Sequence, residues 1–113
     1  MKLRPALGYV NLMDIVDEGR DFRYRLFGSD VARMSEFDLT GKLLSEFPAR
    51  PHVAEFLIAV DRAVWASRRP VYSVRMPSGA DQVMEWHRLT LPLFDGASRV
   101  SRLMVGVVPR TRR

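Results

Sequence analysis

The sequence predicts an α+β domain. Its core is a five-stranded antiparallel sheet, with three helical segments between the second and third strands, in the order β-β-α-α-α-β-β-β. Three observations lead to this prediction. Residues 22–27 alternate in character as a half-buried strand does, and Gly28 stops them. Residues 51–67 form the clearest amphipathic helix of the chain. Three strand-like segments then follow, separated by turn residues.

The first two predicted strands form a hairpin. Residues 7–16 are mostly apolar and leave little polar face, so we expect much of this strand to be buried. The run Asp-Glu-Gly-Arg-Asp at 17–21 is rich in turn residues and leads into the second strand, residues 22–27.

The second strand carries two arginines, Arg23 and Arg25, between its aromatic residues. Charged side chains are seldom buried without a partner. The two arginines are therefore either solvated, with Phe27 turning inward at the end of the strand, or one of them holds an acidic partner, Asp14 or Asp38.

Short helices are expected after Gly28. Ser29 is a good N-cap for a helical turn over residues 30–34, and Thr40 can cap a second helix over residues 41–47. These segments lead to the long helix.

The long helix begins at Pro51, a residue that suits the first turn of a helix. We expect its apolar stripe to face the sheet and its charged residues, Asp61 among them, to lie on the other side. The stripe recurs at i, i+3, i+4, i+7 and i+11 and comprises Val53, Phe56, Leu57, Val60 and Val64.

The last three strands are predicted over residues 70–77, 82–93 and 99–108, with turns at 78–81 and at Asp95-Gly96. Successive side chains of a strand point to opposite faces. In the middle strand one face carries Glu85, His87, Leu89 and Leu91, and the other carries Met84, Trp86, Arg88 and Thr90. We expect the leucine face to meet the core, which leaves Met84, Trp86 and Arg88 outside.

Length and composition narrow the class of protein. The 113 residues suit one domain, which we expect over residues 1–109, with a basic tail over 110–113. The chain has no cysteine, so disulfides and cysteine chemistry are excluded. No apolar run approaches the ~20 residues of a membrane span and no signal peptide precedes the fold, so a soluble cytoplasmic protein is expected. The net charge of +5 comes without an aromatic-interleaved basic stripe, so nucleic acid is not expected as a partner.

Four segments in order resemble one known family. The run FRYRLFGSDVARMSEFDLTGK at 22–42, with its F-R-Y-R-L-x-G strand and D-L-T-G helix start, is similar to the core of a compact bacterial PAS-domain subfamily. Arg-Pro-Val-Tyr at 69–72 and Leu-Pro-Leu-Phe-Asp-Gly at 91–96 resemble two later segments of that subfamily. The resemblance covers residues 7–108. It implies a further helix before the first strand, so we expect the chain to be either natively short or trimmed.

The resemblance implies a sensory or protein-interaction module that signals by binding a small apolar ligand, by pairing with itself or another protein, or by both. The ligand would lie in an apolar cavity between sheet and helices, unless side chains fill that space completely. The candidate cavity residues are Leu12, Phe27, Met34, Leu39, Phe56, Val60, Val64, Leu89, Leu91 and Val105.

An exposed Trp and Met on an open sheet suggest a surface for a partner. We therefore predict a homodimer, or a complex with another signalling protein, through Met84, Trp86 and Arg88.

Enzyme chemistry finds little support in the sequence. There is no glycine-rich phosphate loop, no HExxH motif and no nucleophile elbow. Neither His52 nor His87 suits a haem ligand, and the residues of a flavin pocket are missing, so no cofactor or metal is expected. The alternative is a small cone-shaped α+β enzyme or carrier whose pocket uses His87 with a carboxylate as base.

Overall fold

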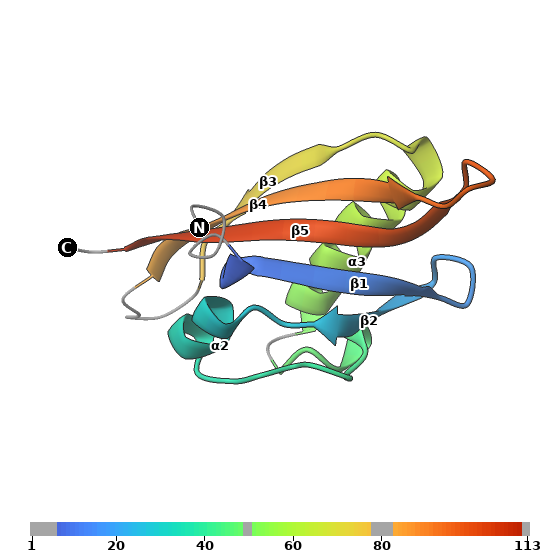
Figure 1. Cartoon of the computed structure of the whole chain (residues 1–113). Helices are drawn as coiled ribbons and strands as arrows, with labels where there is room; N and C mark the ends of the chain where they lie inside the picture. Colours follow the sequence, from blue (N-terminus) through green and yellow to red (C-terminus); the bar gives the residue numbers. More distant parts are fainter. Residues whose placement is uncertain (1–6, 49–50, 78–82, 112–113) are drawn as a thin grey trace.

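A computed structural model of the chain describes residues 7–48, 51–77 and 83–111. Five strands form one antiparallel sheet in the order β2-β1-β5-β4-β3 (Figure 1). The strands are β1 (Val10–Val16), β2 (Asp21–Leu26), β3 (Val71–Arg75), β4 (Val83–Phe94) and β5 (Val100–Thr111). Between β2 and β3 lie α2 (Ser29–Ser35), the 3-10 turn η1 (Leu44–Glu46) and α3 (Pro51–Ser67). The predicted fold class and element order are confirmed.

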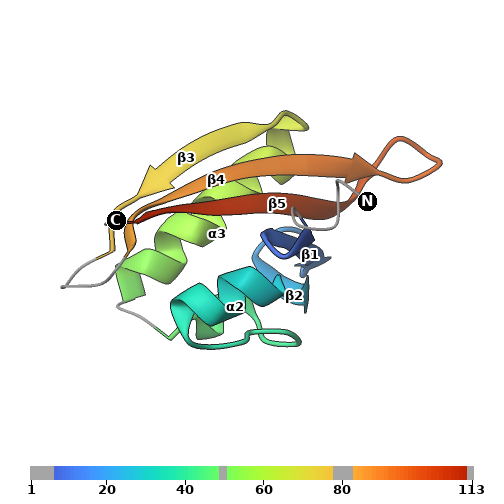
Figure 2. The ribbon, with the colours of Figure 1, turned by 60° about the vertical axis from the view of Figure 1, so that its left-hand side comes forward.

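The helices cover one face of the sheet and leave the other face open. In Figure 1 α3 crosses behind the strands, and Figure 2 shows α2 and α3 on the same side of the sheet. The core fills the space between these two layers. It includes Met13, Phe22, Tyr24, Leu44, Leu57, Val64, Leu103 and Val105, all of which are almost fully buried.

The alternation of β2 follows the prediction. Phe22 and Tyr24 point into the core, whereas Arg23 and Arg25 are exposed on the other face. Arg25 Nε donates to Asp14 Oδ1 at 2.8 Å, so this arginine is both solvated and paired.

The start of α2 differs from the prediction. Ser29 is its first residue and not its cap, and no side chain caps the helix. The backbone N–H groups of Asp30 and Val31 donate instead to the Gly8 carbonyl, at 2.8 and 3.2 Å. A Cβ at Gly28 would lie 2.4 Å from that same oxygen. The close approach of these two backbone segments therefore requires glycine at position 28.

The predicted helix over residues 41–47 is wrong, and only the η1 turn forms there. Thr40 does not cap a helix, because its N–H and hydroxyl both donate to Asp38 Oδ1. The chain then runs beside β2: Gly41 N–H donates to the Tyr24 carbonyl at 2.7 Å, and the Lys42 carbonyl accepts from Tyr24 N–H at 2.9 Å. Pairing with β2 occupies backbone groups that a helix would need.

Helix α3 is rotated relative to the predicted stripe. Its buried residues are Ala54, Leu57, Asp61 and Val64, which share one face. Asp61, expected on the solvent side, is fully buried, and Phe56, expected against the sheet, is 38% exposed. The facing predicted for Asp61 is therefore wrong, and Phe56 lies beside the packed core and not within it.

The predicted facing of β4 is also wrong. Trp86 and Arg88 are 7% and 6% exposed and face the helices, whereas Leu89 is 43% exposed on the open face. Trp86 brings more apolar surface to the core than a leucine does, and Arg88 meets Asp61 of α3 there. Shifting a strand by one residue moves every side chain to the other face, so Leu91 turns outward with Leu89.

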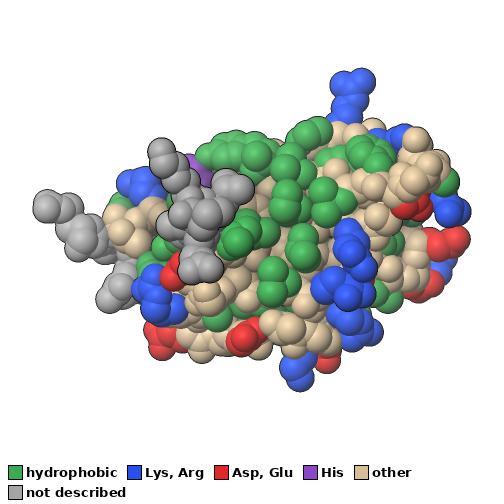
Figure 3. Space-filling model, viewed as in Figure 1, with side chains coloured by type: hydrophobic (Ala, Val, Ile, Leu, Met, Phe, Trp, Pro, Cys, Tyr) green, Lys and Arg blue, Asp and Glu red, His purple; other side chains and the backbone are tan. Residues whose placement is uncertain are grey.

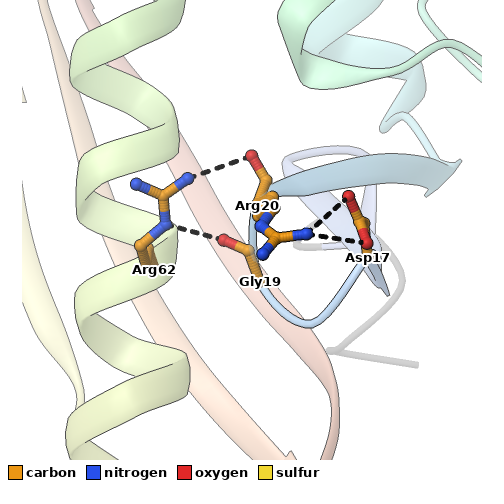
Figure 4. Close-up of polar contacts among 4 residues, drawn as sticks. All are labelled: Asp17, Gly19, Arg20 and Arg62. Carbon is orange, nitrogen blue, oxygen red and sulfur yellow. Dashed lines mark hydrogen bonds and ion pairs between the residues drawn. The ribbon is translucent and has the colours of Figure 1, made fainter.

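The turn between β1 and β2 is held to α3 by one arginine (Figure 4). Arg62 Nε donates to the Gly19 carbonyl at 2.7 Å, and Arg62 Nη2 donates to the Arg20 carbonyl at 3.0 Å. Gly19 has φ +83°, and a Cβ there would lie 2.6 Å from the Trp65 ring. Strain and contact thus both favour glycine in this turn.

The last hairpin forms at Asp95-Gly96 as predicted, and Asp95 Oδ1 accepts from the N–H groups of Ala97 and Arg99. The turn predicted at 78–81 lies outside the described residues. Arg110, expected in the tail, belongs to β5 and donates to Glu85 Oε1 at 2.8 Å. Residues 112 and 113 also lie outside the described residues.

Candidate functional site

A cleft lies between the inner face of the sheet and the helical segments. Its volume is about 1100 Å³, slightly above the range of roughly 300–1,000 Å³ that is usual for pockets that bind small molecules. α2 and the segment after it form one wall, the start of α3 a second, and the inner faces of β2, β4 and β5 the floor. The end of β3 completes the lining.

Most of the lining is apolar and aromatic. Phe27 contacts the ring of Phe37 at a centroid distance of 6.1 Å, and Phe37 meets Phe47 edge to face at 5.6 Å. Further apolar lining comes from Val31, Met34, Val53, Phe56, Leu57, Met76, Val83, Trp86 and Val107. Such a surface binds flat or flexible apolar groups.

A buried ion pair lies at the floor of the cleft. Arg88 Nη2 is 3.9 Å from Asp61 Oδ1, within range of a charge interaction but too long for a hydrogen bond. Neither Asp61 oxygen, nor Arg88 Nε, has a hydrogen-bond partner among the described residues. Burial raises the pKa of Asp61 to about 6, against the attraction of Arg88. Arg88 lines the cleft, whereas Asp61 is outside the lining.

A second guanidinium, Arg75, lines the same cleft from the end of β3. It lies opposite Trp86 in the sheet register, and its guanidinium carbon is 5.9 Å from the centre of the Phe47 ring. Its Nε has no hydrogen-bond partner within the part of the chain that the structure describes. Burial, and then the positive charge of Arg88, lower the pKa of Arg75.

Three of the predicted cavity residues line the cleft: Phe27, Met34 and Phe56. Leu39, Val64 and Val105 are buried in the core outside the lining, and Val60 is half-buried outside it. Leu12, Leu89 and Leu91 lie on the open face of the sheet.

The residues predicted to form the interface lie elsewhere. Trp86 and Arg88 line the cleft, and Met84 is half-buried. The sequence carried one signal that could have indicated this facing of β4. A large aromatic residue alternates there with an arginine, and the helix α3 contains an acidic residue that can pair with the arginine.

The open face of the sheet carries an apolar surface, seen as the green band across the middle of Figure 3. The strand register arranges it in three rows. Leu12, Met104 and Leu91 form one row, Gly106, Leu89 and Tyr72 the next, and Val108, His87 and Val74 the third. We call these nine residues the outer face.

Two residues of the outer face, His87 and Tyr72, form a polar cluster with Glu85, which lies next to that face. His87 Nε2 lies 2.8 Å from Glu85 Oε1, and His87 Nδ1 is hydrogen-bonded to the Tyr72 hydroxyl. Hydrogen bonds from Arg110 and His87 lower the pKa of Glu85 to about 2. His87 does have a carboxylate partner, but this pair lies on the other side of the sheet from the cleft.

No helix among residues 7–48, 51–77 and 83–111 is long and apolar enough to cross a membrane. Over the same residues, no three His, Cys, Asp or Glu side chains gather closely enough to hold a metal ion.

No family model and no curated protein sequence matches the chain. Solved structures do match it. The PAS domain of Bordetella pertussis BvgS is 21% identical, with a TM-score of 0.68 over 92% of this chain and 77% of that one. The chain has the PAS fold.

Two further structures with this PAS arrangement come from Vibrio cholerae. A sensory box sensor histidine kinase is 14% identical, with a TM-score of 0.67 over 98% of this chain and 89% of that one. VqmA, in a complex with ligand and DNA, is 12% identical, with a TM-score of 0.65 over 88% of this chain and 45% of that one. At these identities the likeness concerns the fold alone.

Proposed function

We propose that this chain is a sensory or protein-interaction module. It binds a small, largely apolar ligand in the cleft and signals by pairing with a second copy or with another signalling protein. The observation that carries the proposal is the cleft itself, because a volume of about 1100 Å³ lined by four phenylalanines and Trp86 has room for a ligand. The PAS neighbours include sensor histidine kinases, which agrees with a sensory role.

Native mass spectrometry of freshly purified protein tests ligand binding. We expect a species heavier than the chain by the mass of one small molecule, and the same sample under denaturing conditions, as the matched control, should lose that added mass. A protein that shows only its own mass, and whose melting temperature does not rise with any member of a panel of apolar small molecules, would contradict the ligand-binding part of the proposal.

For pairing we propose a second copy of this chain on the outer face. Contiguous apolar surface on a sheet is a common feature of interaction sites. Gly106 lies in the middle row of this surface, where an added Cβ would meet nothing within 4 Å. Packing within the chain therefore does not explain a glycine there, whereas close approach of another backbone does. VqmA, one of the PAS neighbours, has been described as a dimer.

Sedimentation equilibrium of Leu89→Glu tests the pairing surface. Leu89 is already 43% exposed, so the variant should fold normally, and a charge in the middle row should shift the protein from dimer to monomer. Ala63→Glu, on the exposed side of α3, adds the same charge away from the outer face and should leave the dimer intact. A wild-type monomer at every accessible concentration would contradict the pairing proposal.

The alternative function is a small enzyme or carrier that uses His87 as a base. The carboxylate that this alternative needs is present, since Glu85 contacts His87. The two hypotheses differ in where a ligand acts. An NMR titration of His87 should stay unchanged when a ligand fills the cleft, whereas an enzyme with His87 in its site would show a shifted titration with substrate.

A further inference from the structure

The floor of the cleft carries more positive than negative charge. Arg88 and Arg75 both line it, and Asp61 is the buried carboxylate within ion-pair distance of Arg88. Two guanidinium groups against one carboxylate leave an excess of one positive charge when Asp61 is ionised. The lining also contains one acidic residue, Glu36, which is exposed just after α2. Arg33 and His52 belong to the lining as well, so Glu36 does not make the cleft negative.

Both guanidinium groups retain donors that the described residues do not satisfy. Arg88 Nε and Arg75 Nε are buried without a hydrogen-bond partner in that part of the chain, and the contact of Arg88 with Asp61 is 3.9 Å long. Buried donors without a partner are costly, and charged ones more so. The side chain of Arg88 is only 7% exposed, so bulk water reaches little of it.

We propose, building on the ligand-binding function above, that the cleft takes a singly charged amphipathic carboxylate. Its head group would lie between Arg88 and Arg75, and its apolar body against Phe27, Met34 and Trp86. Arginine presents a planar set of donors that matches a carboxylate, and hydrogen bonds between charged groups are stronger than neutral ones. A single negative charge balances the excess at the floor. The negative charge of the ligand would also offset the repulsion between Arg75 and Arg88. Burial and this repulsion together lower the pKa of Arg75.

Asp61 has a definite place in this arrangement. It holds Arg88 from the α3 side and competes with the ligand for the same positive charge. Removing its charge should therefore strengthen binding of an anion, an effect that a purely structural role of the ion pair does not predict.

Three compounds with one tail test the head group: octanoate, 1-octanol and octylammonium, titrated into the wild-type protein by isothermal calorimetry at neutral pH. We expect octanoate to bind at least about tenfold more tightly than 1-octanol, the size expected for a hydrogen bond to a charged group, and octylammonium to bind least. Arg88→Met keeps an unbranched apolar side chain but removes the guanidinium group, and it should reduce the affinity for octanoate to that for 1-octanol. Arg75→Met should act in the same direction, and Asp61→Asn should raise the octanoate affinity.

Arg69→Met is the matched control, because Arg69 is exposed after α3 and outside the cleft lining. It should leave the octanoate affinity unchanged. Arg88→Met could fail to fold, because it leaves Asp61 buried without its cation, so circular dichroism of each variant comes first. If it is unfolded, Arg75→Met and Asp61→Asn decide the question.

Equal affinity for octanoate and 1-octanol would overturn the carboxylate proposal and leave ligand binding as such intact. No binding of any of the three compounds would also overturn it, while the proposed function would still be judged separately by a ligand retained in native mass spectrometry.

Discussion

Asp61 should make the stability of this domain depend on pH in an unusual direction. It is fully buried on α3, and burial raises its pKa from 3.8 to about 6 although Arg88 acts against this. The folded state therefore holds the proton of Asp61 more tightly than the unfolded chain does. Its contribution to stability is complete below pH 3.8 and is lost as the pH rises through about 6.

The size of this effect follows from the shift. About two pKa units at about 1.4 kcal/mol each correspond to about 3 kcal/mol between the acidic and the neutral limit. Four other carboxyl groups act in the opposite direction, because hydrogen bonds lower the pKa of Asp14, Asp38, Glu85 and Asp95. Their contribution is lost as the pH falls, so the effect of Asp61 must be measured as a difference.

The experiment compares urea unfolding of the wild-type protein with that of Asp61→Asn from about pH 4 to about pH 7. The variant cannot titrate at this position and retains the side-chain volume. We expect the free energy of unfolding of the wild type, relative to the variant, to fall by about 2–2.5 kcal/mol across this range, because at pH 4 the unfolded carboxyl group is already more than half ionised. Glu55→Gln, on the exposed side of the same helix, serves as the control and should change the difference by less than about 0.5 kcal/mol.

A wild-type stability that rises relative to Asp61→Asn with increasing pH would refute this reasoning. It would mean that attraction to Arg88 outweighs the loss of hydration and that the ion pair itself stabilises the fold.

Three further predictions concern the cleft and the backbone. Phe56→Ala should lower the free energy of unfolding by about 1–2 kcal/mol, because its ring borders an open cleft, whereas Leu57→Ala, in the packed core, should lower it by about 2–5 kcal/mol. Urea unfolding of both variants checks this, and equal losses of stability would mean that the cleft is closed. Gly28→Ala should cost about 1–3 kcal/mol because its Cβ would meet the Gly8 carbonyl, with Gly96→Ala, in the exposed last hairpin, as a nearly neutral control in thermal unfolding. Arg62→Ala should speed hydrogen exchange in the turn between β1 and β2 without slowing or speeding exchange in β4, and uniform acceleration would show instead that the whole domain has lost stability.

Much of the fold followed from local patterns. The alternation in Phe22–Phe27, the stop at Gly28 and the apolar repeats of residues 51–67 depend on neighbours in the chain, so the element order could be predicted. The candidate site was predicted less well. Phe27, Met34 and Phe56 do line the cleft, but the two arginines at its floor were assigned elsewhere or overlooked.

Apart from residues 41–47, the sequence by itself therefore determined which segments are strands and helices, because backbone periodicity is a local property. The tertiary structure decided which face of each element is buried. In β4 both faces carry apolar residues, so alternation alone does not choose between them. The choice depends on partners distant in the chain: Arg88 can turn inward because Asp61 of α3 lies there. In the same way, the helix predicted over residues 41–47 does not form, because this segment pairs with the edge of β2. Only the folded chain creates that contact.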